Sequence, residues 1–152
     1  MTDTPILFRW AIAEDFEEVA AMIKQLYAAD ACTMGEIPAN HIESTFEAFL
    51  NNSKLLDIYV FELGSAIVGY ATVTWFWSNE FGGKALVLDE LFVKSAFRSL
   101  GIGKTFIAFM RDYYSDASVF ILEVAPSNEK ARKLYEMLGF KDLKTRHMFL
   151  IK

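Results

Sequence analysis

Apolar residues recur along the chain at two spacings, one typical of helices and one typical of strands. Helical spacing predicts helices at residues 14–30, 41–50, 101–114 and 128–140. Runs rich in β-branched and aromatic residues predict strands at 6–10, 58–63, 66–77, 85–93, 118–125 and 146–152. Residues 30–40 are expected to form a loop.

The order of these elements predicts the fold class. A first strand is followed by two helices, three strands joined by short turns, and then by helix, strand, helix and strand. Short turns are typical of antiparallel neighbours, whereas alternating strands and helices favour parallel pairing. We therefore predict an α/β (α+β) sandwich whose mixed, mostly antiparallel central sheet is flanked by helices. No repeat or linker divides the chain, so one domain over residues 1–152 is expected.

Composition excludes several classes of protein. With 53% hydrophobic and 15% aromatic residues among 152, the chain can build one substantial core. No apolar run approaches the roughly 18 residues of a membrane helix, and the start does not resemble a secretory signal. We expect a cytoplasmic protein without a membrane partner. Cys32 is the single cysteine, and His41 and His147 lie far apart, so no metal site is predicted.

Charge is distributed unevenly. The net charge is −5, which argues against nucleic acid as a partner. Residues 91–111 contain four bases and no acid, so this segment carries +4 and the rest of the chain −9. A basic segment in an acidic protein indicates a local anion site. The alternative is a solvated basic helix face.

The stretch FRSLGIGKTF, residues 97–106, lies within this basic segment. Two glycines around Ile102 permit close approach of the backbone, and the first amides of a helix point outward at the positive end of its dipole. Arg98 and Lys104 add charge. Such a turn suits a diphosphate. A dinucleotide fingerprint needs a third glycine, and a nucleotide P-loop needs a Gly-Lys-Ser/Thr ending, which is missing.

The segment FVKSAFRSLGIGK resembles the acyl-coenzyme A motif of the GNAT N-acetyltransferase superfamily, Arg/Gln-x-x-Gly-x-Gly/Ala. Arg98, Gly101 and Gly103 match it position by position. The preceding LDELFV and the later SNEKARKLYEMLGF also match in order. The resemblance implies the acyl-CoA N-acyltransferase (GNAT) fold along nearly the whole chain, with acetyl-CoA as cofactor and coenzyme A as product.

The same resemblance implies a set of cofactor-binding residues. Backbone groups of Leu91, Phe92 and Val93 would pair with the pantetheine arm like an added strand. The pyrophosphate would be held by Arg98 and by the backbone amides of Ser99, Leu100, Gly101, Ile102, Gly103 and Lys104. Ser99 departs from the commoner glycine. Asn128 matches a cofactor-contacting asparagine, although a helix N-cap is an equally natural role for it.

Acetyl transfer to an amine sets three chemical requirements: a neutral amine, a stabilised oxyanion and a proton for the departing thiolate. An alkyl amine has a pKa of about 10, so a carboxylate is needed to take its proton near pH 7. A tyrosine stays protonated there and can supply the proton to the thiolate. Because SNEKARKLYEMLGF resembles the tyrosine-bearing helix of the family, the resemblance implies that Tyr135 is the general acid and also contacts the cofactor. The alternative is an ordinary core tyrosine.

Asp89 and Glu90 are the candidate bases. Neighbours on a strand project to opposite faces unless a bulge intervenes, so only one would then reach the site. Alternation does not choose between them, and both remain candidates. The alternative is that both merely cap or pair with neighbours at an exposed strand end.

The stretch GYATVTWFWSNEFGGKALVLDELFV resembles the diamine (spermidine/spermine-type) acetyltransferase branch, with the order of its acid pair reversed. The resemblance implies direct transfer to a primary amine of a small cationic substrate: a diamine, a polyamine or a lysine-like amine. Trp75, Trp77 and Glu36 are candidate substrate contacts. Alternatives are a protein or peptide acetyltransferase and an idle acyl-CoA-binding module. A homodimer is expected, because many superfamily members are dimers.

Overall fold

The computed structural model describes residues 4–29, 34–52 and 54–152. Its strands are β1 (Ile6–Trp10), β2 (Leu56–Leu63), β3 (Ala66–Ser78), β4 (Gly83–Val93) and β5 (Ala117–Leu122). Its helices are α1 (Phe16–Ala28), α2 (Ala39–Leu50), α3 (Ile102–Tyr113) and α4 (Glu129–Met137), with short 3-10 turns at Ala13–Asp15 and Ser95–Phe97. No helix in these ranges is long and apolar enough to cross a membrane.

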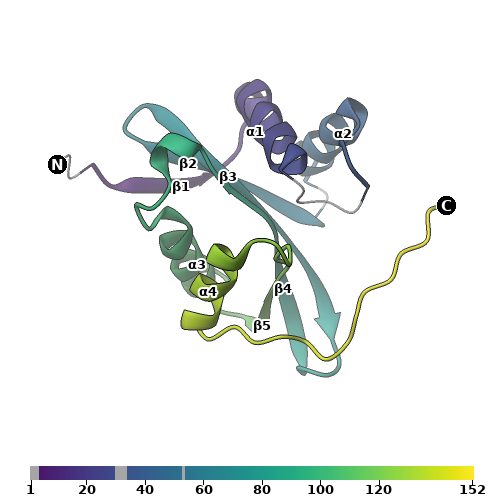
Figure 1. The fold of residues 1–152 in the computed structure, drawn as a ribbon. Coiled ribbons are helices and arrows are strands. Elements are labelled where there is room, and N and C mark those ends of the chain that lie inside the picture. Colours follow the sequence, from purple (N-terminus) through teal and green to yellow (C-terminus); the bar gives the residue numbers. More distant parts are fainter. Residues whose placement is uncertain (1–3, 30–33, 53) are drawn as a thin grey trace.

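The five strands form one sheet in sequence order, β1-β2-β3-β4-β5, with β4 and β5 parallel and every other pair antiparallel (Figure 1). The two long central hairpins arise from local turn chemistry. Gly64 adopts a left-handed conformation with a φ of 65°, which turns β2 into β3. The predicted mixed sheet is confirmed.

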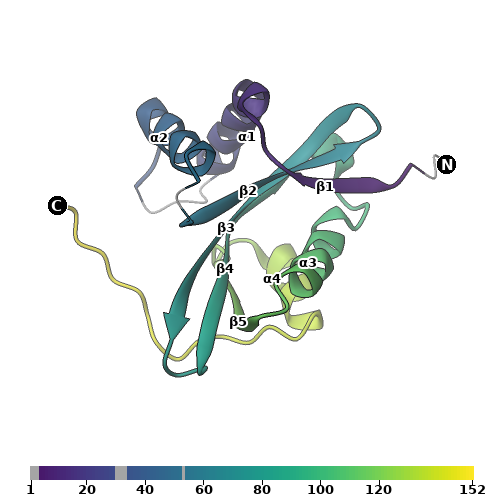
Figure 2. The ribbon, with the colours of Figure 1, turned by 180° about the vertical axis from the view of Figure 1, so that it is seen from behind.

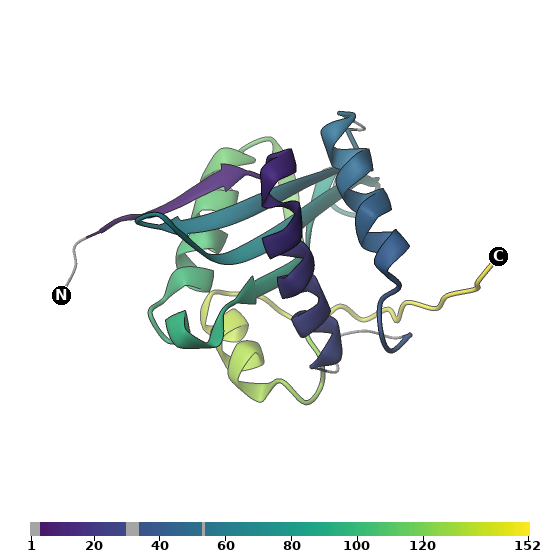
Figure 3. The ribbon, with the colours of Figure 1, turned by 90° about the horizontal axis from the view of Figure 1, so that it is seen from above.

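Helices cover both faces of the sheet, as the view from above shows (Figure 3). The face bearing α1 and α2 buries apolar residues of those helices against Ile58, Val60, Tyr70 and Phe92. The opposite face buries α3 against a second cluster, which includes Tyr59, Leu86 and Leu88. The same arrangement is visible from behind (Figure 2). The sheet thus separates two environments, and each strand residue belongs to one or the other.

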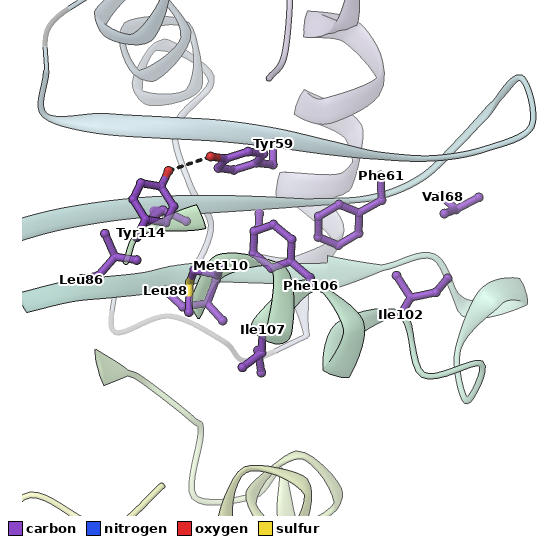
Figure 4. Close-up of a cluster of buried hydrophobic side chains, with 12 residues drawn as sticks. Tyr59, Phe61, Val68, Leu86, Leu88, Ile102, Phe106, Ile107, Met110 and Tyr114 are labelled. Carbon is purple, nitrogen blue, oxygen red and sulfur yellow. Dashed lines mark hydrogen bonds between the residues drawn. The ribbon is translucent and has the colours of Figure 1, made fainter. Parts of the chain in front are cut away.

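On the α3 side of the core, aromatic rings pack among aliphatic side chains (Figure 4). Phe106 is fully buried and contacts the rings of Phe8 and Phe61 with centroids 5.2 and 4.9 Å apart. The hydroxyl groups of Tyr59 and Tyr114 lie 2.7 Å apart in a hydrogen bond, and Tyr114 also donates to Asp57. Burial raises the pKa of Tyr59 to about 12, so this pair stays protonated and the polar atoms remain satisfied.

Element ends fall within a few residues of the predicted ones. Gly139 follows the last helix with a left-handed φ of 96°, a conformation that commonly ends helices. The predicted loop at 30–40 and Cys32 lie partly or wholly outside the described residues. The strand predicted at 118–125 ends earlier, at Leu122.

The prediction of a strand at residues 146–152 is wrong. Residues 141–152, here called the C-terminal tail, run as extended chain with no strand assignment. The apolar side chains of the tail suit a strand, but a strand also needs a neighbour to complete its hydrogen bonds. No described strand of the chain pairs with the tail.

Candidate active site

Strand β4 has two halves with different neighbours. From Lys84 to Leu88 it pairs with β3 on one side and β5 on the other, the last β5 pair being Leu88 with Leu122. Beyond Leu88 it pairs only with β3. Backbone groups on the β5 side of Leu91, Phe92 and Val93 are therefore not used by a strand ladder. These are the groups predicted to pair with a pantetheine arm.

A β-bulge lies at the boundary between the two halves. Thr72 faces Glu90 and Val73 faces Leu88, so Asp89 is the extra residue. In an unbroken strand Leu88 and Glu90 would point the same way. The bulge instead leaves Leu88 in the α3-side core and turns Glu90 towards α1 and α2.

Both acids consequently line one cavity of about 250 Å³ on the α1/α2 face. Asp89 and Glu90 therefore do not project to opposite faces of the sheet, as neighbours in an unbroken strand would, because the strand is bulged. The walls combine apolar side chains with polar ones, and the full set is Ile23, Tyr27, Ile37, Ile42, Thr45, Leu55, Leu56, Thr72, Thr74, Asp89 and Glu90.

Glu90 is held by two tyrosine hydroxyls. Tyr27 donates to Oε2 at 2.5 Å and Tyr70 donates to Oε1 at 3.1 Å. Burial raises the pKa of Glu90 above its ordinary value, the Tyr27 hydrogen bond lowers it, and the charge of Asp89 raises it again. Both oxygens of this carboxylate are thus engaged, and the side chain is fixed in place.

Asp89 has a different environment. Its side chain is exposed to solvent and makes no hydrogen bond with any residue that the structure describes. Partial desolvation of the carboxylate raises the pKa of Asp89, and the negative charge of Glu123 raises it further. Asp89 is free to exchange a proton.

Tyr27, Tyr70 and Thr72 complete the surroundings of the acids, and the sequence analysis did not identify them. Thr72 is 3% exposed, and its Oγ1 is a buried polar atom without a hydrogen-bond partner among the described residues. It lies near enough to Glu90 to lower the pKa of that group, without reaching hydrogen-bond geometry. In the sequence, Tyr27 and Tyr70 are recognisable only as apolar positions of a helix and a strand. Their positions opposite an acid appear only in the folded chain.

The glycine-containing turn precedes α3 as predicted. Gly101 is the N-cap residue with a φ of 77°, and the first intrahelical bond runs from the Thr105 amide to the Gly101 carbonyl at 2.9 Å. The amides of Ile102, Gly103 and Lys104 precede that bond and face away from the helix. Leu100 and Lys104 are exposed beside them. This donor set suits a diphosphate.

Side chains around the turn add positive charge. Arg98 donates from Nε to the Val93 carbonyl at 2.8 Å and stacks over Phe92 at 5.4 Å, so its head group is anchored at the end of β4. Ser99 has a left-handed backbone conformation with a φ of 65°. Glycine adopts this conformation most readily, which explains why glycine is commoner at this position of the motif. Lys130 of α4 donates to Ser99 Oγ at 3.1 Å, a cation that the sequence analysis missed. The donors and charges present fit the diphosphate of acetyl-CoA.

Helix α4 supplies the remaining predicted cofactor residues. Asn128 is its N-cap, and the Asn128 Oδ1 accepts the Ala131 amide at 3.2 Å, which confirms the capping role. Tyr135 is half-buried against the α3-side core, with the Phe140 ring 6.0 Å away. Burial raises the pKa of Tyr135, so its hydroxyl keeps its proton well above neutral pH. Its role as general acid remains a prediction.

The structure does not bring the predicted substrate contacts to the acid pair. Trp75 and Trp77 line a second cavity at the tip of the β3–β4 hairpin, together with Lys84 and Asp116. Glu36 is exposed, and its neighbour Ile37 lines the acid cavity. No group of three His, Cys, Asp or Glu side chains in the described part of the chain could hold a metal.

Comparison with known proteins identifies the family. The chain belongs to the acetyltransferase (GNAT) family, whose model matches residues 9–140. It is 33% identical over 89 residues to an uncharacterized N-acetyltransferase of Methanocaldococcus jannaschii, covering 57% of this chain and 53% of that protein. It is 35% identical over 82 residues to a thialysine N-epsilon-acetyltransferase of Sus scrofa, covering 53% and 48% respectively. The chain thus spans about half the length of these curated relatives.

Solved structures confirm the fold. A possible acetyltransferase from Clostridium difficile 630 superimposes with a TM-score of 0.80 at 19% identity, covering 97% of this chain and 99% of the other. An aminoglycoside N-acetyltransferase solved in complex with CoA gives a TM-score of 0.78 at 19% identity, with 99% and 97% coverage. Acetyltransferases of this family use acetyl-CoA.

Proposed function

We propose that this chain transfers the acetyl group of acetyl-CoA directly to a primary amine of a small cationic substrate, in a ternary complex. One observation carries the proposal. The bulge in β4 brings Asp89 and Glu90 to one cavity at the point where β4 parts from β5. An acid pair in a partly apolar cavity is suited to bind an alkylammonium ion and to remove its proton.

Within the pair, we assign Asp89 as the proton acceptor. Asp89 is exposed and carries no hydrogen bond within the described residues, so it can accept a proton directly or through water. Its raised pKa brings it nearer to the pH at which a general base works best. Glu90, fixed by two tyrosines, supplies a steady negative charge that attracts the cationic substrate.

The cavity walls support a substrate with an alkyl chain. Ile23, Ile42 and Leu56 provide apolar contacts, while Thr72 and Thr74 offer hydroxyl groups. A diamine, a polyamine or a lysine-like amine combines such a chain with a cationic end. The similarity to a thialysine N-epsilon-acetyltransferase favours the same class, since that relative acts on a side-chain amine. The aminoglycoside enzymes share the fold at low identity and do not extend this assignment.

The cofactor would be held on the other side of β4. The amides of Ile102, Gly103 and Lys104, with Arg98 and Lys130, would hold the diphosphate, and Leu91 and Val93 would offer backbone groups to the pantetheine arm. Acetyl-CoA supplies an activated thioester when bound. Tyr135 would donate its hydroxyl proton to the departing sulfur. Its raised pKa means that the hydroxyl is protonated at neutral pH before the transfer. A cytoplasmic location and a homodimer also belong to this proposal.

The test is release of free thiol from acetyl-CoA against a panel of amines: putrescine, spermidine, spermine, lysine-like amino acids, an aminoglycoside and short peptides. We expect release that depends on one of the alkylamines and falls steeply in Tyr135→Phe. Release stimulated only by peptides would instead support a protein acetyltransferase. Tight acetyl-CoA binding without release for any amine would support an idle binding module.

A further inference from the structure

The cavity beside Asp89 and Glu90, here called the acid cavity, has its charges on one strand. Among the described residues that line it, these two are the only charged ones, and they follow each other in β4. Five others are aliphatic and come from α1, from α2, from the segment before α2 and from the beginning of β2: Ile23, Ile42, Ile37, Leu55 and Leu56. The acid cavity therefore holds both negative charges on β4 and offers mainly apolar walls elsewhere.

Strand register sets the distance between the acids and the apolar wall. Glu90 of β4 pairs with Thr72 of β3, whereas Leu56 of β2 pairs with Thr74, two residues further along β3. With about 3.4 Å per residue and about 4.8 Å between strands, the backbone at Leu56 lies roughly 7 Å along the sheet and roughly 10 Å across it from Glu90. A ligand that reaches from the acids into the cavity therefore has its far end beside aliphatic side chains.

The apolar wall extends from the interior of the protein to solvent. Ile23 and Ile42 are 2% and 1% exposed, whereas Leu55 is 68% exposed and lies at the mouth of the cavity. Three acids in and before α2 are exposed and are not part of the lining: Glu36, Glu43 and Glu47. Water and salt screen exposed charges, so these acids contribute little to a cation held inside the cavity.

The apolar wall treats a charge and an alkyl chain in opposite ways. A second ammonium group placed against it would lose its hydration without gaining a counter-ion, which is costly. An alkyl chain gains about four-fold in binding for each methylene that leaves water. The cavity volume of about 250 Å³ lies just below the roughly 300–1,000 Å³ of pockets for drug-sized ligands, so it suits a small amine with a short chain.

We propose that the acid cavity selects a primary amine with one positive charge and an uncharged alkyl remainder, and that a second cationic centre weakens binding. The inference rests on the proposed function and narrows its substrate class to aliphatic monoamines. Asp89 and Glu90 receive the ammonium group, Ile23, Ile42 and Leu56 contact the chain, and Leu55 contacts its end at the mouth. A diamine or polyamine has to hold its second ammonium group in solvent, which takes its chain away from this wall.

The first test compares kcat/KM for butylamine, pentylamine and hexylamine with the values for putrescine and cadaverine, measured as thiol release from acetyl-CoA. We expect kcat/KM to rise about four-fold per methylene among the monoamines until the cavity is filled. Pentylamine differs from cadaverine only by lacking the second amino group, and it should be the better substrate by at least about 10-fold. A kcat/KM for cadaverine equal to or above that for pentylamine would overturn the proposal.

The second test places a carboxylate on the apolar wall. Leu55→Glu adds one at the mouth, and the fold should tolerate it because Leu55 is largely exposed. The ratio of kcat/KM for cadaverine to that for pentylamine should rise at least about 10-fold, since a hydrogen bond to a charged group is worth that much.

Two controls separate charge from size and from position. Leu55→Gln has nearly the size of Leu55→Glu without the charge, so it should lower kcat/KM for pentylamine without raising that for cadaverine. Leu50→Glu adds a carboxylate at the end of α2, at a 48% exposed residue outside the lining, and should leave the ratio unchanged. A ratio that does not move in Leu55→Glu, or that moves equally in a control, would contradict the proposed position of the chain.

A third measurement keeps this inference separate from the proposed function. Calorimetric titration of the CoA-bound chain with pentylamine and cadaverine measures amine binding without acetyl transfer. Tighter binding of pentylamine with no thiol release from acetyl-CoA would support the inference and contradict the transferase. Thiol release that is faster with cadaverine or spermidine than with pentylamine would support the transferase and overturn the inference. If neither amine binds and no amine is acetylated, both fail.

Discussion

The two halves of strand β4 differ in their neighbours, and the difference shows how a site is made from a regular sheet. The half from Lys84 to Leu88 is enclosed by two strands, and Leu86 and Leu88 are core residues. The half beyond the bulge has one strand neighbour and carries Asp89 and Glu90 into a cavity. The first half gives stability, whereas the second leaves backbone and carboxylate groups available for ligands.

The largest expected effect comes from removing the proposed base in the second half. Asp89→Asn should lower kcat/KM for the amine by about 10²–10⁴-fold, since general-base catalysis is typically worth that much. The wild-type rate should also fall as pH drops through the raised pKa of Asp89, and this limb should vanish in the variant. Steady-state thiol release from pH 5 to 9 measures both. Glu80→Gln, an exposed acid in the hairpin turn, is the control and should leave the profile unchanged.

Tyr135→Phe should reduce kcat by about 100-fold, the lower end of what a general acid contributes, because the departing sulfur would lose its proton donor. Since the substitution removes only a hydroxyl and Tyr135 packs against the core, binding of CoA should change less than two-fold by calorimetry. A wild-type kcat in Tyr135→Phe would exclude Tyr135 as the general acid and leave it as a core residue.

Glu90→Gln should act mainly on substrate binding. Because this carboxylate attracts the cation, the KM for the amine should rise about 10-fold while kcat changes less, in line with roughly 1.5–3 kcal/mol for a hydrogen bond to a charged group. Tyr70→Phe should raise the same KM by a smaller factor, since it only positions Glu90. If kcat collapses in Glu90→Gln and survives in Asp89→Asn, the roles of the two acids are reversed.

Buried Asp15 and half-buried Glu90 should make the free energy of unfolding depend on pH in opposite directions. The Arg9 guanidinium lowers the pKa of Asp15 below 3.8, so the stability from Asp15 is present above that pH and is lost as pH falls through its folded pKa. Burial raises the pKa of Glu90 above 4.5, so its contribution is present below that pH and is lost as pH rises through its folded pKa. Urea unfolding of Asp15→Asn and Glu90→Gln from pH 3 to 7 should show slopes that change in opposite senses.

The smallest effect is expected at the anion-binding turn. Ser99→Gly relieves a left-handed backbone conformation at a serine and should add roughly 0.5–1 kcal/mol to the free energy of unfolding, or about 1–4 °C in Tm, with kcat unchanged. Gly101→Ala places a side chain at a φ of 77° and should lower Tm by a similar amount. Differential scanning fluorimetry measures both, and a lower Tm for Ser99→Gly would show that the serine side chain stabilises the turn.

Much of this fold follows from local sequence. The short turn between β2 and β3, which contains Gly64, was predicted because turns of this kind depend on residues next to each other in the chain. The bulge at Asp89 was not, because no glycine or other local signal marks it. Tyr27 lies 63 residues from its carboxylate partner, Glu90, so only tertiary structure reveals that pair. The C-terminal tail was predicted as a strand because its composition suits one, but no strand among the described residues pairs with it.

The most direct test of the claim that Asp89 is the base measures cofactor binding and proton transfer separately, since the account assigns them to opposite sides of β4. It measures the Kd of acetyl-CoA and the single-turnover rate of amine acetylation in wild type and Asp89→Asn, with the best amine from the panel. The account predicts an unchanged Kd and a rate at least about 100-fold lower in the variant. An unchanged rate in Asp89→Asn would contradict the claim that the bulged acid is the base.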